Sequence, residues 1–347
     1  MKLSDIGEFG LIARIAAGTD AGDARLIRGI GDDCAVVETG DPGRALLLTT
    51  DTLVEGVHFT RASTSPRLLG RKALAASLSD IAAMGGTPTV FTVSLAAPPA
   101  LSVAWVDAFY AGLRARARAS GAALAGGDTS SAPSRITVSV GLLGECPADE
   151  IVYRRGAHPG DGVYVTGRPG ESAAGLAILR AEAAGGGDFG EAFSRLKARH
   201  LDPEPRLAAG RHLAAHGIAS AMIDVSDGIL ADLGHILEIA KAGAAIQVAA
   251  LPLSADLQAA AEHMKIDPAG LALTGGEDYE LLFTARADLD VAALSKALSL
   301  EITRIGRVTP PGTPLRVLDP SGNPRPLSPA GHDHFRSAPR PGSDFSS

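Results

Sequence analysis

Apolar residues recur along the chain with two different periods, one typical of helices and one typical of strands. Segment 67–84 is apolar at helical spacing, follows Ser65-Pro66 and ends before Gly85-Gly86, which predicts a capped helix. Segment 102–120 also has helical spacing, whereas 136–142 alternates apolar and small polar residues as a half-buried strand does. Such segments continue to residue 308, and the alternation predicts an α/β fold.

One polar residue interrupts the apolar face of the helix predicted at 67–84. Asp80 falls in register with Leu69, Ala73 and Ala76. A carboxylate is almost never buried without a partner. We therefore interpret Asp80 as a functional residue.

Several other aspartates lie where an apolar segment meets a glycine-rich turn. Each has a plain structural explanation when it is taken alone, because Gly-Asp-Asp makes an ordinary turn and Asp or Ser caps helices. For example, Asp227 or Ser226 can be explained as a helix cap, but this explanation does not account for Asp224. The set of acids that includes Asp80 is Asp32, Asp33, Asp51, Asp80, Asp128, Asp224 and Asp227.

This set of acids predicts a shared site. Element ends in an open α/β fold tend to converge on one crevice, where ligands bind. Neighbouring carboxylates repel one another, and divalent cations of the Mg²⁺ kind with oxygen ligands would offset that repulsion. We expect a site with several metal ions that holds a polyphosphate.

Length and composition limit the remaining possibilities. The 347 residues suggest two domains, and we place them at 1–147 and 148–335, followed by a disordered tail at 336–347. A net charge of -7 and 4% aromatic residues argue against nucleic-acid binding. Cys34 and Cys146 lack the spacing of a zinc site or a disulfide framework. With no signal peptide or transmembrane run in the sequence, we expect a cytoplasmic protein that binds no membrane.

Standard phosphate-binding and nucleophile motifs are absent from the sequence. There is no GxxxxGK[ST] loop, no kinase HRD or DFG motif and no GxSxG elbow. The sequence is still compatible with phosphoryl transfer in which metal ions and the positioning of the substrates provide the catalysis.

The ordered motifs together resemble the thiamine-monophosphate kinase family. The resemblance runs from about Gly7 to Phe335, and its motifs are Gly31-Asp32-Asp33-Cys34, Thr50-Asp51-Thr52, Leu78-Ser79-Asp80, Gly126-Gly127-Asp128-Thr129, Asp224-Val225-Ser226-Asp227-Gly228 and Gly275-Gly276-Glu277-Asp278. That family is similar in fold to aminoimidazole ribonucleotide synthetase and selenophosphate synthetase. The resemblance implies two α/β (α+β) domains, with mixed sheets flanked by helices, and a homodimer joined through the N-terminal sheets. It also implies direct in-line transfer of the ATP γ-phosphate to thiamine monophosphate, with several Mg²⁺ ions and no phosphoenzyme.

Roles are carried over position by position from the family motifs. No general base is expected, because the attacking phosphate oxygen is already ionised. For the substrate, the resemblance implies His58, Glu277 and His332, the last in place of the family's usual aromatic residue. For ATP it implies Gly127, Asp128, Arg154 and Ser226. For the metal ions it implies Asp33, Thr49, Thr50, Asp51, Asp80, Asp128, Asp224 and Asp227.

Two alternatives stay open at this point. The chain could be another ATP-dependent synthetase of the same superfamily, although no reactive cysteine or lysine is evident. It could also be a non-catalytic protein that binds divalent metal such as Ca²⁺, although no DxDxDG loop with a closing Glu is present.

Overall fold

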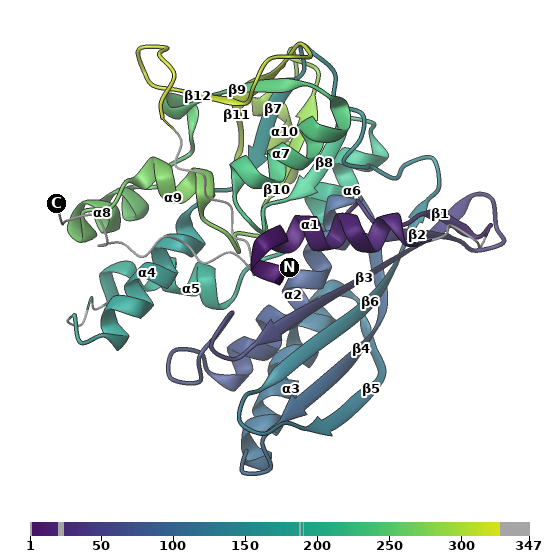
Figure 1. Cartoon of the computed structure of the whole chain (residues 1–347), viewed down its shortest axis with the longest axis vertical. Coiled ribbons are helices and arrows are strands. Elements are labelled where there is room, and N and C mark those ends of the chain that lie inside the picture. The colour runs from purple at the N-terminus through teal and green to yellow at the C-terminus, as the bar shows by residue number, and fades with distance from the viewer. Residues whose placement is uncertain (1, 20–23, 187–188, 190, 327–347) are drawn as a thin grey trace.

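The fold is built around two six-stranded sheets. The structure is a computed structural model that describes residues 2–19, 24–186, 189 and 191–326 (Figure 1). His332 and the tail predicted at 336–347 lie outside the described residues. Among the described helices, none is long and apolar enough to cross a membrane.

The first sheet has the strand order β1-β2-β3-β6-β4-β5. Its neighbouring strands are antiparallel except β4 and β5, which run parallel at one edge. The elements of this half are α1 (Leu3–Ala17), β1 (Leu26–Arg28), β2 (Ala35–Glu38), β3 (Arg44–Val54), α2 (Pro66–Ala83), β4 (Thr87–Ala97), α3 (Val103–Ser120), β5 (Ala123–Ser131) and β6 (Thr137–Pro147).

The second sheet has the order β12-β9-β11-β7-β10-β8, and β12 with β9 is its one parallel pair. Its strands are β7 (Gly162–Thr166), β8 (Ala221–Asp224), β9 (Gly243–Gln247), β10 (Leu281–Ala285), β11 (Ile302–Thr309) and β12 (Arg316–Leu318). Its helices are α4 (Glu171–Ala183), α5 (Ser194–Leu201), α6 (Leu207–Ala215), α7 (Ile229–Ala240), α8 (Ala255–Met264), α9 (Pro268–Thr274) and α10 (Val291–Leu298). Two mixed sheets flanked by helices confirm the predicted fold class, whereas the domain boundary at 147 and 148 stays a prediction.

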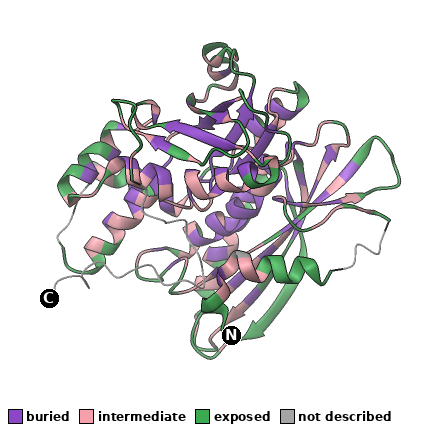
Figure 2. Ribbon diagram, turned by 45° about the horizontal axis from the view of Figure 1, so that its top comes forward, coloured by how far each residue is buried: buried purple, intermediate pink, exposed green. Residues whose placement is uncertain are grey.

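Helix α2 lies between the two halves of the molecule (Figure 1). It packs against α3, β3 and β6 on one side and against α6 and β8 on the other. Ser65 caps it, because the Ser65 hydroxyl accepts a hydrogen bond from Leu68 N–H at 3.3 Å. The sequence prediction of this helix is confirmed, and most of its residues are buried (Figure 2).

Helices α2 and α3 approach closely because a glycine on each faces the other. A Cβ atom added at Gly70 would lie 2.0 Å from Phe109 O, and one added at Gly112 would lie 1.8 Å from Arg67 O. Both neighbours are backbone atoms, which cannot swing aside. The position of α2 beneath the first sheet therefore depends on these glycines.

One prediction about local structure was wrong, and one strand is longer than its apolar core. Strand β3 continues past the apolar residues 45–48 to Val54 and pairs with β6 over its whole length. The Gly126-Gly127-Asp128 motif is not a turn but part of the edge strand β5, every residue of which is exposed. A Cβ atom at Gly127 would lie 1.9 Å from Val93 O, so the glycine allows the close pairing of β5 with β4.

Candidate active site

Three carboxylates from distant parts of the chain meet beside α2. Asp33 comes from the bend before β2, Asp80 from the last turn of α2, and Asp224 from the end of β8. One oxygen of each lies within 4.8 Å of the others. The predicted convergence is thus found for these three acids, although they come from a bend, a helix and a strand end rather than from parallel strands.

Residues of β3 lie next to this group of three. The Thr49 hydroxyl donates a hydrogen bond to Asp80 Oδ2. Thr49 is buried and Thr50 exposed, and successive strand residues point to opposite faces. The Thr50 hydroxyl therefore points away from Asp80. Asp51 is half-buried, and its charge is among the causes that raise the pKa of Asp80.

Burial and mutual repulsion raise the pKa values of these acids. For Asp80 the pKa is raised well above the usual value, first by burial and then by Asp51, Asp224 and Asp33. Burial, with the charge of Asp33 as the next cause, raises the pKa of Asp224 to about 8. Burial also raises the pKa of Asp51. Without a cation, the protein holds these carboxyl groups closer together than their charges favour.

Arg154 places a positive charge in direct contact with this group. Its Nη2 lies 2.7 Å from Asp33 Oδ1. Burial alone would lower the pKa of Arg154, but the charge of Asp33 and its hydrogen bond outweigh burial and raise the pKa above the usual value. A guanidinium held in this way is suited to bind phosphate oxygens.

Asp32 has a different role from its neighbour Asp33. Its Oδ2 accepts from Arg28 Nε at 3.0 Å, and its Oδ1 accepts from the backbone N–H of Arg154 at 2.7 Å. Both oxygens are therefore used to tie the bend before β2 to the chain at Arg154. The sequence alone left Asp32 open between shaping the turn and binding a metal ion through water, and this bonding favours the first role.

The residues present fit a hard divalent cation. Among the described residues, Asp33 Oδ2 and Asp51 Oδ2 are buried side-chain oxygens with no hydrogen-bond partner. Buried carboxylate oxygens usually have a partner, because leaving one unsatisfied is costly. All the donors here are oxygens, the ligand type that Mg²⁺ prefers.

Sequence reasoning missed one acid near this site. Asp232, in the first turn of α7, is buried, and its Oδ2 accepts from the backbone N–H groups of Asp227 and Gly228 at 3.2 and 3.0 Å. Burial and then the charges of Asp224 and Asp227 raise its pKa well above the usual value. The signal was present in the sequence, since an acid in the first turn commonly caps a helix. The Asp232 carboxylate fixes the Asp227 segment beside Asp224.

Not every predicted metal ligand belongs to the group of three. Asp128 lies on the exposed strand β5, and Asp227 precedes α7. Neither is part of the carboxylate group formed by the described residues Asp33, Asp80 and Asp224. Their assignment to metal ions rests on the family motif alone.

Glu277, one of the predicted substrate residues, lies near the N-terminal half of α2. Glu277 Oε1 is 3.0 Å from the Nζ atom of Lys72. Burial would raise the pKa of Glu277, but Lys72, His200 and His58 together lower it. His58 is therefore within electrostatic range of Glu277, as their shared assignment to the substrate requires. No sequence pattern pointed to Lys72 or His200.

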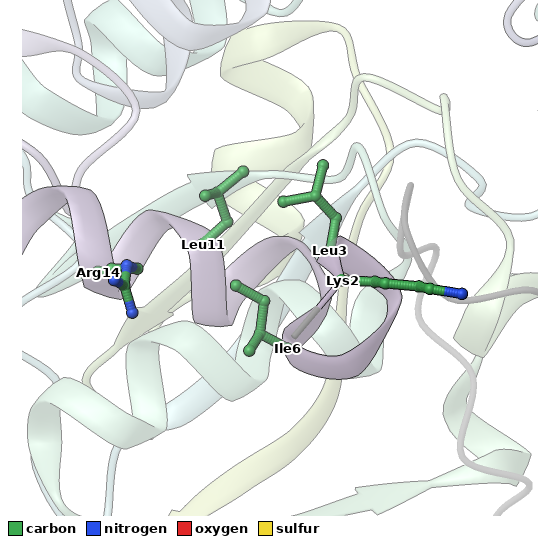
Figure 3. A pocket seen from close by; sticks show the side chains of 5 residues that line it. All are labelled: Lys2, Leu3, Ile6, Leu11 and Arg14. Carbon is green, nitrogen blue, oxygen red and sulfur yellow. The ribbon is translucent and has the colours of Figure 1, made fainter.

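A separate hollow of about 500 Å³ lies along α1 (Figure 3). Its lining contains three apolar side chains and two cationic ones, namely Lys2, Leu3, Ile6, Leu11 and Arg14. None of them is a carboxylate or a hydroxyl that could bind a metal ion. The chemistry of this hollow is therefore unrelated to that of the acid group.

Comparisons with known proteins identify the family of this chain. Residues 31–146 match the family described as AIR synthase related protein, N-terminal domain, and residues 158–316 match its C-terminal domain. The thiamine-monophosphate kinase of Escherichia coli strain K12 is 40% identical over 336 residues, which cover 95% of this chain and 98% of that protein. The enzyme of the same name from Mycobacterium tuberculosis H37Rv is 41% identical over 283 residues, or 81% of each chain.

Solved structures show the same relationship. The structure described as AaThiL complexed with AMPPCP and TMP has a TM-score of 0.82 at 36% identity and covers 96% of this chain and 99% of that one. Escherichia coli HypE, a hydrogenase maturation protein, has a TM-score of 0.67 at 19% identity, covers 88% of this chain and 93% of that one, and shares the fold. With two relatives of one name above 30% identity along most of their length, the chain belongs to the thiamine-monophosphate kinase family of phosphotransferases.

Proposed function

We propose that this protein transfers the γ-phosphate of ATP to thiamine monophosphate, with thiamine diphosphate and ADP as products. The observation that carries the proposal is the convergence of Asp33, Asp80 and Asp224 in a chain that belongs to this family. A related protein has been solved with AMPPCP and TMP, and AMPPCP is an analogue of ATP.

The acids of the site would hold Mg²⁺. Asp33, Asp51, Asp80 and Asp224 are the residues we assign to it, with Thr49 positioning Asp80 through their hydrogen bond. Bound there, Mg²⁺ would neutralise phosphate charge on both substrates. For Asp128, Asp227 and Thr50 a role as ligands of further ions follows only from the family motif.

Arg154 supports the binding of ATP in this proposal. Its guanidinium lies at the acid group and keeps its charge. Because Asp33 fixes its orientation, little side-chain entropy is lost when a phosphate oxygen becomes a further partner. Ser226 and Gly127 are the other positions we assign to ATP from the family motif.

The reaction needs positioning more than proton transfer. The attacking atom is a phosphate oxygen that is ionised near pH 7, so no general base is required. We propose direct in-line transfer without a phosphoenzyme, which agrees with catalysis by positioning and charge neutralisation. Glu277 and His58 are assigned to the organic part of thiamine monophosphate, and His332 stays a prediction outside the described residues.

A homodimer and a cytoplasmic location are also part of the proposal. Strand β5 has an open edge and is exposed along its whole length. Open sheet edges in proteins are usually covered or blunted. Pairing of the N-terminal sheets of two subunits, as the family resemblance implies, agrees with this exposure.

The deciding experiment incubates the protein with ATP, Mg²⁺ and thiamine monophosphate and measures thiamine diphosphate and ADP by chromatography. We expect the two products in equal amounts, and none when EDTA is added. Free thiamine in place of the monophosphate is the control acceptor and should give no diphosphate. Equal activity with free thiamine, or no product at any Mg²⁺ concentration, would contradict the proposal.

A further inference from the structure

A fully buried lysine, which the family motifs quoted above do not include, lies at the centre of a polar network. Lys72, on α2, is 1% exposed. Its Nζ atom lies 3.0 Å from Glu277 Oε1 and 3.4 Å from His200 Nε2. His200 Nδ1 is in turn 3.2 Å from Ser172 Oγ. We call these four side chains, Lys72, His200, Ser172 and Glu277, the Lys72 network.

The Lys72 network contains one ion pair and a neutral histidine. Burial, followed by the nearby charge of Lys72, lowers the pKa of His200 to about 4. His200 is therefore uncharged near pH 7, and the charge of Lys72 is balanced within the network by Glu277. Replacing such a buried pair by apolar residues is often neutral or stabilising. Stability alone therefore does not explain why a lysine occupies this place.

Glu277 is fixed by its backbone as well as by its side chain. Its φ is 63° and that of Tyr279 is 52°, in the left-handed region that side chains rarely adopt. The N–H of Glu277 donates to Ser226 O at 2.8 Å, and that of Tyr279 donates to Val225 O at 2.9 Å. The Glu277 side chain is nevertheless 22% exposed. The side chain is thus held in place, with Oε1 buried beside Lys72 and another part of the side chain open to a ligand.

The Lys72 network and the acid group each contain one residue of the same helix. Lys72 and Asp80 are eight residues apart on α2, which corresponds to about 12 Å along the helix axis. Lys72 contacts Glu277, and Asp80 meets Asp224, so both face the second half of the chain. The carboxylate at the Lys72 end is therefore set at a fixed distance from the acid group that we assign to the phosphates.

We propose that Lys72, supported by His200, is a positioning residue that fixes the Glu277 carboxylate for recognition of the cationic thiazolium and aminopyrimidine part of the acceptor substrate. The inference rests on the proposed function and adds the means by which the acceptor is selected. A carboxylate in a fixed place attracts a cationic ring system, whereas a mobile one loses entropy when it binds. ATP does not depend on this contact.

The test is steady-state kinetics of the full-length Lys72→Met variant with each substrate varied in turn. We expect the KM for thiamine monophosphate to rise about tenfold, while the KM for ATP stays within about twofold. In a Glu277→Gln background, the same Lys72 substitution should have no further effect on the KM, since Lys72 acts through Glu277. Calorimetric titration of thiamine monophosphate, with a non-hydrolysable ATP analogue present, should show the same loss of affinity.

Arg116→Met is the matched control. Arg116 is another buried cation, 2% exposed, and it pairs with Asp202 and Glu204 rather than with Glu277. Its loss should lower the melting temperature without changing the KM for thiamine monophosphate. If Lys72→Met does not fold, Lys72→Gln, which also removes the charge, is assayed in the same way.

Three outcomes would overturn the inference. They are an unchanged KM in the folded Lys72 variant, a KM that rises equally for both substrates, and an effect that simply adds to that of Glu277→Gln. Each of these requires an active wild-type enzyme. A wild-type protein that makes no thiamine diphosphate would instead refute the proposed function, so the two failures are distinguishable.

Discussion

At the residue scale, the candidate site is an accumulation of like charge that the fold tolerates. Asp80 shows this most clearly, since burial and three neighbouring acids raise its pKa while a single threonine hydroxyl opposes them. In a protein without a ligand this arrangement costs stability. The cost is intelligible only if a cation offsets it when the protein works.

Asp80→Asn should lower turnover by about a hundredfold or more, because even residues that merely support metal ligands contribute roughly 10–100-fold. Asparagine also needs neither a buried charge nor an added proton at this position, so the melting temperature of the metal-free protein should stay the same or rise. Turnover and thermal melting are measured on the same preparation. Asp288→Asn, an exposed acid paired with Arg286, is the control and should leave both values unchanged. Wild-type turnover in Asp80→Asn would show that Asp80 is only structural.

At the element scale, the site depends on how α2 is held. Local sequence signals were sufficient for this helix, because Ser65, Pro66 and the apolar spacing all act within a few residues. They were insufficient for β5, where a glycine pair typical of turns belongs to a strand that only its pairing with β4 defines. They were also insufficient for the contact of Lys72 with Glu277, since nothing near either residue in the sequence specifies a partner so far along the chain. Pairings between distant segments are decided by tertiary packing, which local patterns do not encode.

The contact of α2 with α3 gives a prediction about stability. Gly112→Ala would place a methyl group against Arg67 O, so we expect the free energy of unfolding to fall by about 2 kcal/mol or more. Gly234→Ala is the matched control, because it lies inside α7 with no atom within 4 Å of the added Cβ. That change should be neutral or stabilise by about 0.5–1 kcal/mol. Urea denaturation measures both, and equal effects would show that the close approach of the two helices carries no energetic weight.

At the scale of the whole molecule, the site joins the two halves of the chain. Asp33 and Asp80 belong to the half with the first sheet, and Asp224 belongs to the half with the second. Arg154 and Asp32 add two further links across the same region. Occupation of the site by a cation should therefore stabilise the molecule as a unit rather than one half alone.

The raised pKa values predict how stability depends on pH. Asp224 has a pKa of about 8 in the folded protein against 3.8 for an unperturbed group, so the folded state binds the extra proton between these values. Its contribution to stability is complete below about pH 4 and is lost as the pH rises towards 8. Burial raises the pKa values of Asp51 and Asp80 too, which adds to this loss.

Melting of the metal-free protein between pH 6.5 and pH 8 measures this effect, and we expect the melting temperature to fall. The lowered pKa of His200 acts in the opposite direction, but from pH 6.5 upwards it contributes at most about 0.4 kcal/mol, because only half of the unfolded imidazole is still protonated at pH 6.5. Added Mg²⁺ should raise the melting temperature more at pH 8 than at pH 6.5, since it competes with protons for the same oxygens. Asp224→Asn should flatten the dependence on pH. A metal-free protein whose melting temperature rises over this range would contradict the interpretation.

The spacing of Lys72 and Asp80 on α2 has a consequence for selectivity. An α-helix is rigid along its axis, so the distance between the two ends of the proposed acceptor site is constant. A loop between them could adapt its length. We propose that Glu277 binds the rings and the acid group binds the phosphates. A molecule with the same rings but a different distance between rings and phosphate would then contact only one of these two places at a time. The backbone of one helix would thus select substrates by the distance between their rings and their phosphate, without any side chain dedicated to rejecting the wrong substrate.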